Sequence, residues 1–241
     1  MKILVDIGNS RLKWGVEEFN EVNFCGAVDY RQDDYIEPLV QSWKNLSRPK
    51  VLAISSVVEH HRVEQLIQIA QLLWPDVDIV LPAASAFACN VTNAYAQPEK
   101  LGIDRWLNLL ALRHFYPGQA CVVDCGTAIT VDFLDDLGQH LGGLISPGLT
   151  LMKKSLLHGT ADLPFSEVVQ CPGLADHTDA AIYCGTLYAA VGLIELALSR
   201  QPDQQNIILT GGDASVIARN LAVRTVVEPD FVLKGMALYC Q

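Results

Sequence analysis

Basic residues are scarce in this sequence, and nowhere do they form a cluster. Among its 241 residues, 17 Lys and Arg stand against 27 Asp and Glu, which gives a formal net charge of −10 at pH 7. Nucleic acids and anionic membrane surfaces are bound through concentrated positive charge. The composition therefore argues against a nucleic-acid or membrane partner.

Targeting and disulfide patterns are also missing. Asp6 interrupts the N-terminal stretch MKILVDIG, so the apolar core of a signal peptide is absent. The seven cysteines are odd in number, form no C-x-x-C pair, and several lie inside apolar runs. This usage indicates reduced thiols rather than a disulfide framework or a zinc site. We therefore expect a cytoplasmic protein.

The most apolar segment is AAIYCGTLYAAVGLIELAL, at 180–198. It approaches the length that spans a bilayer, but it contains Glu195 and lacks a basic flank. Half of the whole sequence is hydrophobic, which is enough for a sizeable core. We therefore expect a buried helix, in which Gly185, Ala189 and Gly192 allow another helix to approach closely.

Two common nucleotide-binding signatures, G-x-x-x-x-G-K-[ST] and G-x-G-x-x-G, are absent. The sequence contains an internal repeat instead. ILVDIGNSRLKWGV near the N-terminus aligns without gaps to CVVDCGTAITVDFL, which pairs Asp6 with Asp124 and Ser10 with Ala128. One copy lies in each half of the chain.

Both halves show the same order of expected elements. Three strands come first, KILVDIG, RLKWGVEE and EVNFCGAV in one half and ACVVDCG, TAITVDFLD and HLGGLISPG in the other. Short turns between successive strands predict antiparallel hairpins. Helices are then expected at 35–46, 62–74, 98–112, 149–163, 179–200 and 213–221, with strands at 51–58, 77–81 and 206–212. This alternation predicts two similar α/β lobes, 1–116 and 117–241, with a ligand site in the cleft between them.

Each repeat carries a carboxylate from an apolar strand into a glycine turn. Such a carboxylate is costly unless a cation meets it, and the glycine lets the backbone approach a ligand. Turn amides can cradle phosphate, Asn9, Ser10 and Thr127 can donate to its oxygens, and Lys13 adds charge. One D-x-G alone is more often a plain hairpin turn. Two copies in matching context favour a site for a polyphosphate with its Mg²⁺.

The expected helix at 98–112 carries polar residues beside an apolar face formed by Ile103, Trp106, Leu107 and Leu110. Asp104, Arg105 and Asn108 fall on another face. They are either solvated charges, with Asp104 favoured by the helix dipole, or a site in which Asp104 accepts a hydroxyl proton and Arg105 holds an anion. The spacing leaves both interpretations open.

Several motifs together resemble one family. In this order, DIGNSRLK, GIDR, DCGTAITVD, GGLISPG, TADLP, HTDAAIYCG and LTGGDA resemble the motifs of type III pantothenate kinases. Those kinases belong to the acetate and sugar kinase, Hsc70 and actin superfamily. The resemblance therefore implies an α/β protein of two duplicated ribonuclease H-like lobes, with mixed β-sheets flanked by helices, in an actin-like ATPase architecture.

The resemblance also implies an activity, which is ATP-dependent phosphorylation of pantothenate to 4′-phosphopantothenate, the first step of coenzyme A biosynthesis. It makes Asp104 the proton acceptor, Asp124 the ligand of a monovalent cation (K⁺ or NH₄⁺), and Asp6 a residue near the Mg²⁺ of ATP. The implied ATP-binding residues are Asp6, Ile7, Gly8, Asn9, Ser10, Arg11, Leu12, Lys13 and Thr127. The implied pantothenate-binding residues are Tyr95, Gly102, Ile103, Asp104, Arg105 and Thr178.

One position departs from the family pattern, because His177 stands where a small polar residue is expected before Thr178. The resemblance further implies a homodimer, in which the partner chain helps to close the pantothenate pocket and the 180–198 helix contributes to the interface.

Two other functions fit the same fold. The chain could be a non-catalytic regulatory or binding protein, or a kinase for another small hydroxylated or carboxylate substrate. The presence of both Asp104 and Arg105 argues against the first. The GIDR motif and the lack of an inserted sugar-binding subdomain argue against the second.

Overall fold

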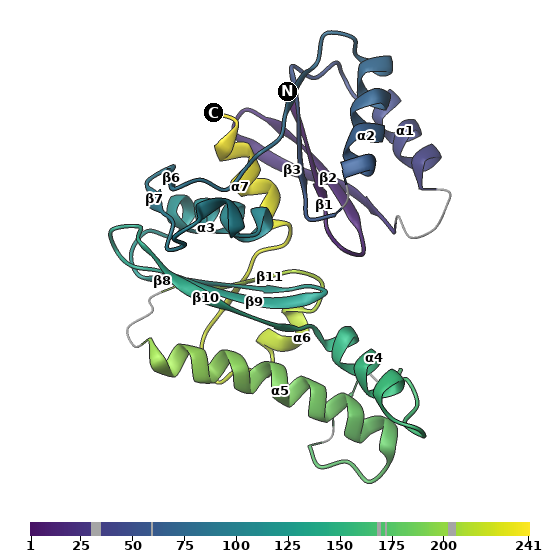
Figure 1. Cartoon of the computed structure of the whole chain (residues 1–241), viewed down its shortest axis with the longest axis vertical. Coiled ribbons are helices and arrows are strands. Elements are labelled where there is room, and N and C mark those ends of the chain that lie inside the picture. The colour runs from purple at the N-terminus through teal and green to yellow at the C-terminus, as the bar shows by residue number, and fades with distance from the viewer. Residues whose placement is uncertain (30–34, 59, 168–169, 172, 202–205) are drawn as a thin grey trace. The chain divides into compact units, whose positions relative to one another are not determined.

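Two five-stranded sheets organise the chain (Figure 1). The structure is a computed structural model that describes residues 1–29, 35–58, 60–167, 170–171, 173–201 and 206–241. Its contacts define unit 1, made of Met1–Tyr116, Gly138–His140 and Asp230–Gln241, and unit 2, made of Pro117–Leu137 and Leu141–Pro229. The expected lobes, 1–116 and 117–241, stay a prediction. The contacts add that the C-terminal segment packs within unit 1.

The sheet of unit 1 has the order β3-β2-β1-β4-β5. The strands are β1 (Lys2–Ile7), β2 (Leu12–Glu18), β3 (Glu21–Val28), β4 (Val51–Ser56) and β5 (Asp78–Val80). β1, β2 and β3 pair antiparallel as the hairpin pattern predicts, whereas β4 pairs parallel with β1 and β5 parallel with β4. The mixed sheet expected for this half is therefore confirmed.

The run KILV is apolar because helices cover both faces of β1. Ile3, Val5 and Ile7 belong to the same core cluster as residues of α1 (Ile36–Lys44) and α2 (His60–Leu73), which lie together beside the sheet in Figure 1. On the other face, α7 (Phe231–Tyr239) packs on β1, and its Leu233 lies close to Gly15 of β2. This C-terminal helix was not predicted from the sequence.

α3 (Ile103–Phe115) packs on α7 and corrects two expectations about the segment 98–112. The segment is not one helix, because a short 3₁₀ turn η1 (Pro98–Lys100) precedes α3 and Leu101 adopts an extended conformation between them. The interpretation of Arg105 and Asn108 as solvated residues is wrong, since they are only 4% and 1% exposed. The two-residue strands β6 (Phe87–Ala88) and β7 (Val91–Thr92) form a hairpin that the sequence did not reveal.

The sheet of unit 2 repeats the order of the first, β10-β9-β8-β11-β12. Its strands are β8 (Ala120–Cys125), β9 (Ala128–Leu134), β10 (His140–Pro147), β11 (Asn206–Thr210) and β12 (Val226–Val227). β8 pairs antiparallel with β9 and parallel with β11, as β1 does with β2 and β4. The predicted duplication of a mixed sheet is thus confirmed.

The register corrects the ungapped alignment of the two repeats. Asp6 pairs with Lys13 across the first hairpin, whereas Asp124 pairs with Thr130 across the second. The first turn is therefore one residue longer, so that Ala128 corresponds to Arg11 rather than to Ser10. Lys13 consequently has Thr130 as its counterpart in unit 2.

α5 (Thr178–Arg200) runs along one face of the unit 2 sheet, accompanied by α4 (Leu149–Gly159) and α6 (Ala214–Ala218) (Figure 1). By length and composition alone α5 could cross a membrane, but half of its most apolar window is buried inside the protein. The prediction of a core helix is confirmed. Gly185 and Gly192 are exposed and open to space, so within the described chain no helix approaches them closely.

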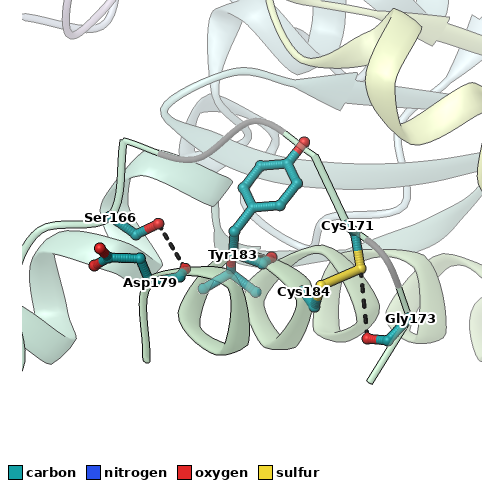
Figure 2. The surroundings of a disulfide bond; sticks show 7 residues. Ser166, Cys171, Gly173, Asp179, Tyr183 and Cys184 are labelled. Carbon is teal, nitrogen blue, oxygen red and sulfur yellow. Dashed lines mark hydrogen bonds between the residues drawn. A yellow bond between two sulfur atoms is a disulfide. The ribbon is translucent and has the colours of Figure 1, made fainter. Parts of the chain in front are cut away.

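A disulfide joins Cys171 to Cys184 of α5, with Cα atoms 5.1 Å apart (Figure 2). The expectation that all cysteines are reduced thiols is therefore wrong for this pair. The sequence did not reveal the bond, because two cysteines 13 residues apart form no recognisable motif. The other five cysteines, all of which the structure describes, are free. Burial raises the pKa of Cys121 and Cys125, which makes both thiols poor nucleophiles.

The packing of α3 on α7 generates the first prediction. A Cβ atom at Gly235 of α7 would lie 1.9 Å from the carbonyl oxygen of Leu107 in α3. We expect Gly235→Ala to force the two helices apart and to lower the free energy of unfolding by about 1–3 kcal/mol. Urea unfolding followed by tryptophan fluorescence checks this, because all four tryptophans lie in unit 1.

The matched control is Gly159→Ala at the end of α4, where an added Cβ meets no atom within 4 Å. This change should leave the stability the same or raise it by up to about 1 kcal/mol, measured by circular dichroism. Equal stabilities of the Gly235→Ala variant and the wild type would contradict the described packing.

Candidate active site

Asp6 lies at the carboxyl end of β1, beside a hydroxyl from the neighbouring parallel strand. Ser55 of β4 donates a hydrogen bond from Oγ to Asp6 Oδ1 over 2.7 Å. The turn that follows is closed by the Gly8 amide, which donates to the carbonyl oxygen of Arg11 over 3.0 Å. Ile7 and Leu12 on either side of the turn are buried, so the parts of the turn that can meet a ligand are its backbone and the residues between them.

Lys13 pairs with a residue that the sequence did not single out. Its Nζ lies 2.8 Å from Oδ1 of Asp230, at the start of α7. Asp230 has a left-handed backbone, φ 54°, and its side chain does not cap the helix. The one available signal was a Pro-Asp pair directly before an apolar segment, which is typical of a helix start.

Three carboxylates of unit 1, those of Asp6, Asp104 and Asp230, interact electrostatically. The pKa of Asp6 is raised to about 6, mainly by burial; the charges of Asp104 and Asp230 also raise it, while the Ser55 hydrogen bond and the charge of Lys13 lower it. Asp104 stands in the first turn of α3. The phosphate-type turn and the expected proton acceptor are therefore close enough to interact.

Four of the expected pantothenate residues, Tyr95, Gly102, Asp104 and Arg105, lie together in unit 1. Arg105 Nη1 donates to the hydroxyl of Tyr95 over 2.9 Å, and its guanidinium lies over the Tyr95 ring, 5.7 Å from the centroid. The Arg105 amide donates to Asp104 Oδ1 over 2.8 Å, and an added Cβ at Gly102 would lie 2.7 Å from the same oxygen. A side chain at Gly102 would therefore displace the Asp104 carboxylate from its present position.

The Tyr95 ring also stacks with a residue that sequence reasoning missed. His140 is 1% exposed, and its ring stacks on Tyr95 with centroids 6.3 Å apart. Asn93 Oδ1 accepts a hydrogen bond from the Tyr95 amide over 2.9 Å and fixes the backbone there. The Tyr95 ring therefore has both a guanidinium and an imidazole as neighbours.

In unit 2, glycine turns from three parts of the sequence meet around Asp124 at the end of β8. Gly211 of the LTGGDA turn has φ +92°, and a Cβ there would lie 2.6 Å from Asp124 Oδ1. Gly148 of GGLISPG donates to the carbonyl oxygen of Thr127 over 2.8 Å, and the Asp213 amide donates to that of Cys125 over 3.0 Å. These motifs, which the sequence left as ligand loops or plain bends, thus share one location.

Ile103 is the first residue of α3 in unit 1, whereas Thr178 is the first residue of α5 in unit 2 and is exposed. The His177 ring that precedes it pairs with Asp176, Nδ1 to Oδ1 over 2.9 Å. Among the described residues, no group of three or more His, Cys, Asp or Glu side chains is arranged to hold a metal ion.

Comparison with solved structures defines the class of protein. A Campylobacter jejuni protein assigned to the Baf family of transcriptional activators matches with a TM-score of 0.62 at 22% identity, over 97% of this chain and 94% of that one. The activator of the 2-hydroxyisocaproyl-CoA dehydratase from Clostridium difficile, with bound ADPNP, matches with a TM-score of 0.54 at 14% identity, over 99% and 93%. The fold is that of the actin-like ATPases.

Sequence comparison then identifies the family. The model of the type III pantothenate kinase family matches residues 2–200. The type III pantothenate kinase of Nitrosococcus oceani is 39% identical over 98% of this chain and 92% of its own, and that of Dechloromonas aromatica is 38% identical over 98% and 97%. The chain belongs to the type III pantothenate kinase family, whose members are phosphotransferases that use ATP.

The raised pKa of Asp6 predicts a dependence of stability on pH. The folded chain holds this proton more tightly than the unfolded chain, so the free energy of unfolding should fall as the pH rises from about 4 to about 6. Asn cannot ionise. Asp6→Asn should therefore match the wild type at pH 4 and exceed its free energy of unfolding by about 1–3 kcal/mol at pH 7.5.

Urea unfolding at several pH values, followed by the tryptophans of unit 1, measures this difference. Asp78→Asn, which removes an exposed carboxylate from β5 of the same sheet, is the control and should follow the wild-type profile. A stability difference between Asp6→Asn and wild type that does not change with pH would show that Asp6 is not held as described.

Proposed function

We propose that this chain phosphorylates pantothenate to 4′-phosphopantothenate with ATP, and that Asp104 accepts the proton of the pantothenate hydroxyl. The observation that carries the assignment is the electrostatic interaction of Asp104 with Asp6, because it brings the expected base to the expected phosphate turn. In most analyses, phosphoryl transfer has a loose transition state, so positioning and charge neutralisation matter more than base strength.

Pantothenate has a carboxylate, for which Arg105 is the proposed partner. A guanidinium binds a carboxylate through two parallel hydrogen bonds, and it does so best when its plane is already fixed. The hydrogen bond to Tyr95 and the position over its ring support this role, because they hold the Arg105 plane in unit 1. Tyr95, Gly102, Ile103 and Thr178 are proposed as further substrate contacts.

ATP is proposed to bind through the turn Asp6–Lys13 and through Thr127. The backbone between Ile7 and Leu12 and the side chains of Asn9 and Ser10 can donate to phosphate oxygens. Asp6, whose burial disfavours its ionised form, suits a position near the Mg²⁺ that accompanies ATP. The ion supplies charge neutralisation, and the residues of the turn hold the phosphates in place.

Asp124 is proposed as the ligand of a monovalent cation, K⁺ or NH₄⁺. The register supports this difference between the repeats, because Thr130 stands across from Asp124 where Lys13 stands across from Asp6. The second turn therefore has no lysine of its own at that position, and a bound cation would supply the missing charge.

We further propose a cytoplasmic homodimer in which α5 contributes to the interface. Gly185, Tyr188, Ala189, Gly192 and Leu196 follow one side of α5 at helical spacing and are exposed. Tyr188 and Leu196 are 51% and 58% exposed, and small residues beside them would let a second helix approach. A second copy of the chain is the proposed partner of this stripe.

The role of Asp104 is tested with Asp104→Asn in an assay that couples ADP release to pantothenate addition. We expect kcat to fall by roughly 10²–10⁴-fold, the usual effect of losing a general base, while the fold is retained. Glu99→Gln, which removes an exposed carboxylate from the adjacent η1 turn, should leave kcat unchanged. Near-normal turnover by folded Asp104→Asn would refute the assignment. A wild type that phosphorylates acetate, glycerol or a hexose as fast as pantothenate would refute the substrate.

The monovalent site is tested by initial rates in Tris buffer with Mg·ATP and KCl, NH₄Cl or NaCl at matched ionic strength. We expect activity with K⁺ or NH₄⁺, little with Na⁺, and a higher KM for ATP without the larger cations. Asp124→Asn should lose this dependence together with most activity, whereas Asp136→Asn, at an exposed position after β9, should keep both. Equal wild-type rates in all three salts would remove the cation from the proposal.

A further inference from the structure

The segment between α4 and α5 is fastened to the first turns of α5. We infer that Lys153 of α4 is a positioning residue. It holds Ser166 of this segment, and the hydrogen bond from Ser166 to α5 in turn fixes the position of Thr178. The inference rests on the proposed contact between Thr178 and pantothenate, and it concerns unit 2 alone.

The fastening begins at a fully buried hydroxyl. Ser166 is 0% exposed, and its Oγ donates to the carbonyl oxygen of Asp179 over 2.7 Å (Figure 2). A buried hydroxyl needs such a partner, so the bond is costly to break. Asp179 directly follows Thr178. The hydrogen bond therefore fixes the backbone of the turn that carries Thr178.

Lys153 binds the backbone of Ser166, whose side chain binds Asp179. Its Nζ donates to the carbonyl oxygen of Ser166 over 3.0 Å, and it lies over the rings of Phe165 and Tyr183, 5.0 Å and 5.8 Å from their centroids. Tyr183 belongs to α5, while Phe165 and Ser166 belong to the connecting segment. One ammonium group thus joins three elements through a charge-assisted hydrogen bond and two cation–π contacts.

The first turn of α5 depends on this hydrogen bond because no side-chain cap stabilises it among the described residues. His177 occupies the N-cap position, but within the described chain no side chain makes a cap hydrogen bond there. An uncapped first turn keeps backbone amides without helical partners and frays easily. The disulfide from Cys171 reaches Cys184, more than one helical turn beyond Thr178. The bond from Ser166 acts closer to Thr178 than the disulfide does.

A second role for Lys153 predicts a different kinetic result. Its charge also lowers the pKa of Asp213, whose burial raises it, so Lys153 is near the LTGGDA turn. If Lys153 bound a nucleotide phosphate, its loss would raise the KM for ATP. If it positions Thr178, its loss raises the KM for pantothenate. The contacts with Ser166, Phe165 and Tyr183 favour the second result.

The test uses Lys153→Met in the full-length enzyme. We expect the KM for pantothenate to rise roughly 10-fold, since small misplacement of a contact residue has effects of this order or larger, with kcat and the KM for ATP changed less than about 2-fold. Lys153→Arg, which can donate to the same carbonyl and lie over the same rings, should restore the wild-type KM. Lys154→Met, at the exposed neighbouring position on α4, is the matched control and should have no effect.

Two further variants separate the possible failures. Ser166→Ala removes only the hydrogen bond to Asp179 and should raise the KM for pantothenate as Lys153→Met does. Thr178→Val removes the hydroxyl with little change of shape and reports on the contact itself. If Thr178→Val leaves the KM for pantothenate unchanged, the proposed contact is wrong and the inference falls with it. If Thr178→Val raises this KM while Lys153→Met and Ser166→Ala do not, or Lys153→Met raises the KM for ATP instead, the positioning role alone is overturned.

Discussion

The burial of the Asp6 carboxylate at the end of β1 is the constraint on which the first unit depends. β1 lies in the middle of its sheet with helices on both faces, and that position removes most of the water from the residue at its end. Burial therefore makes the ionised form of Asp6 costly, and Ser55 and Lys13 offset only part of that cost. The parallel strand β4 is what delivers Ser55, the C-terminal helix α7 is what delivers Asp230 to Lys13, and α3 brings Asp104 into range. Elements far apart in the sequence are thus organised around one carboxyl group.

Unit 2 has the same strand order as unit 1, but the residue that faces its strand-end carboxylate across the hairpin carries no charge. Thr210 of β11 pairs with Asp124 as Ser55 of β4 pairs with Asp6, so a hydroxyl residue stands beside the carboxylate in both sheets. The difference lies across the hairpin, where a shorter turn replaces Lys13 by the buried Thr130. The backbone at Gly211 approaches the Asp124 carboxylate more closely than a residue with a Cβ could. The two repeats thus share their strand order, while the positive charge of Lys13 has no counterpart at Thr130.

The sequence predicted the elements whose signal is local. Apolar strands ending in glycine turns gave both meanders, and the repeated order gave the duplicated sheet. α7 was missed because FVLKGMALY is apolar on nearly all sides and follows no long strand, so its periodicity is weak. Arg105 and Asn108 were misjudged because one apolar stripe suggests one buried face, whereas α3 packs against α7, β4 and β7. The Cys171–Cys184 bond and the Lys13–Asp230 pair join residues whose proximity exists only after folding. Motif residues were accessible from the sequence, and the residues that hold them in place were not.

The charge of the first site limits what can bind there. The carboxyl groups of Asp104 and Asp230 act on that of Asp6, and the Lys13 ammonium that acts on it too is paired with Asp230 over 2.8 Å. A bare phosphate would be repelled by such a group, since like charges a few ångströms apart repel strongly where water is scarce. Under the proposed function, the same carboxyl groups would favour an ATP phosphate that is accompanied by Mg²⁺ over a bare one. The Lys13–Asp230 ion pair also keeps the start of α7 beside the turn. The acidic character of the whole composition thus has a local counterpart in the three carboxyl groups that interact around Asp6.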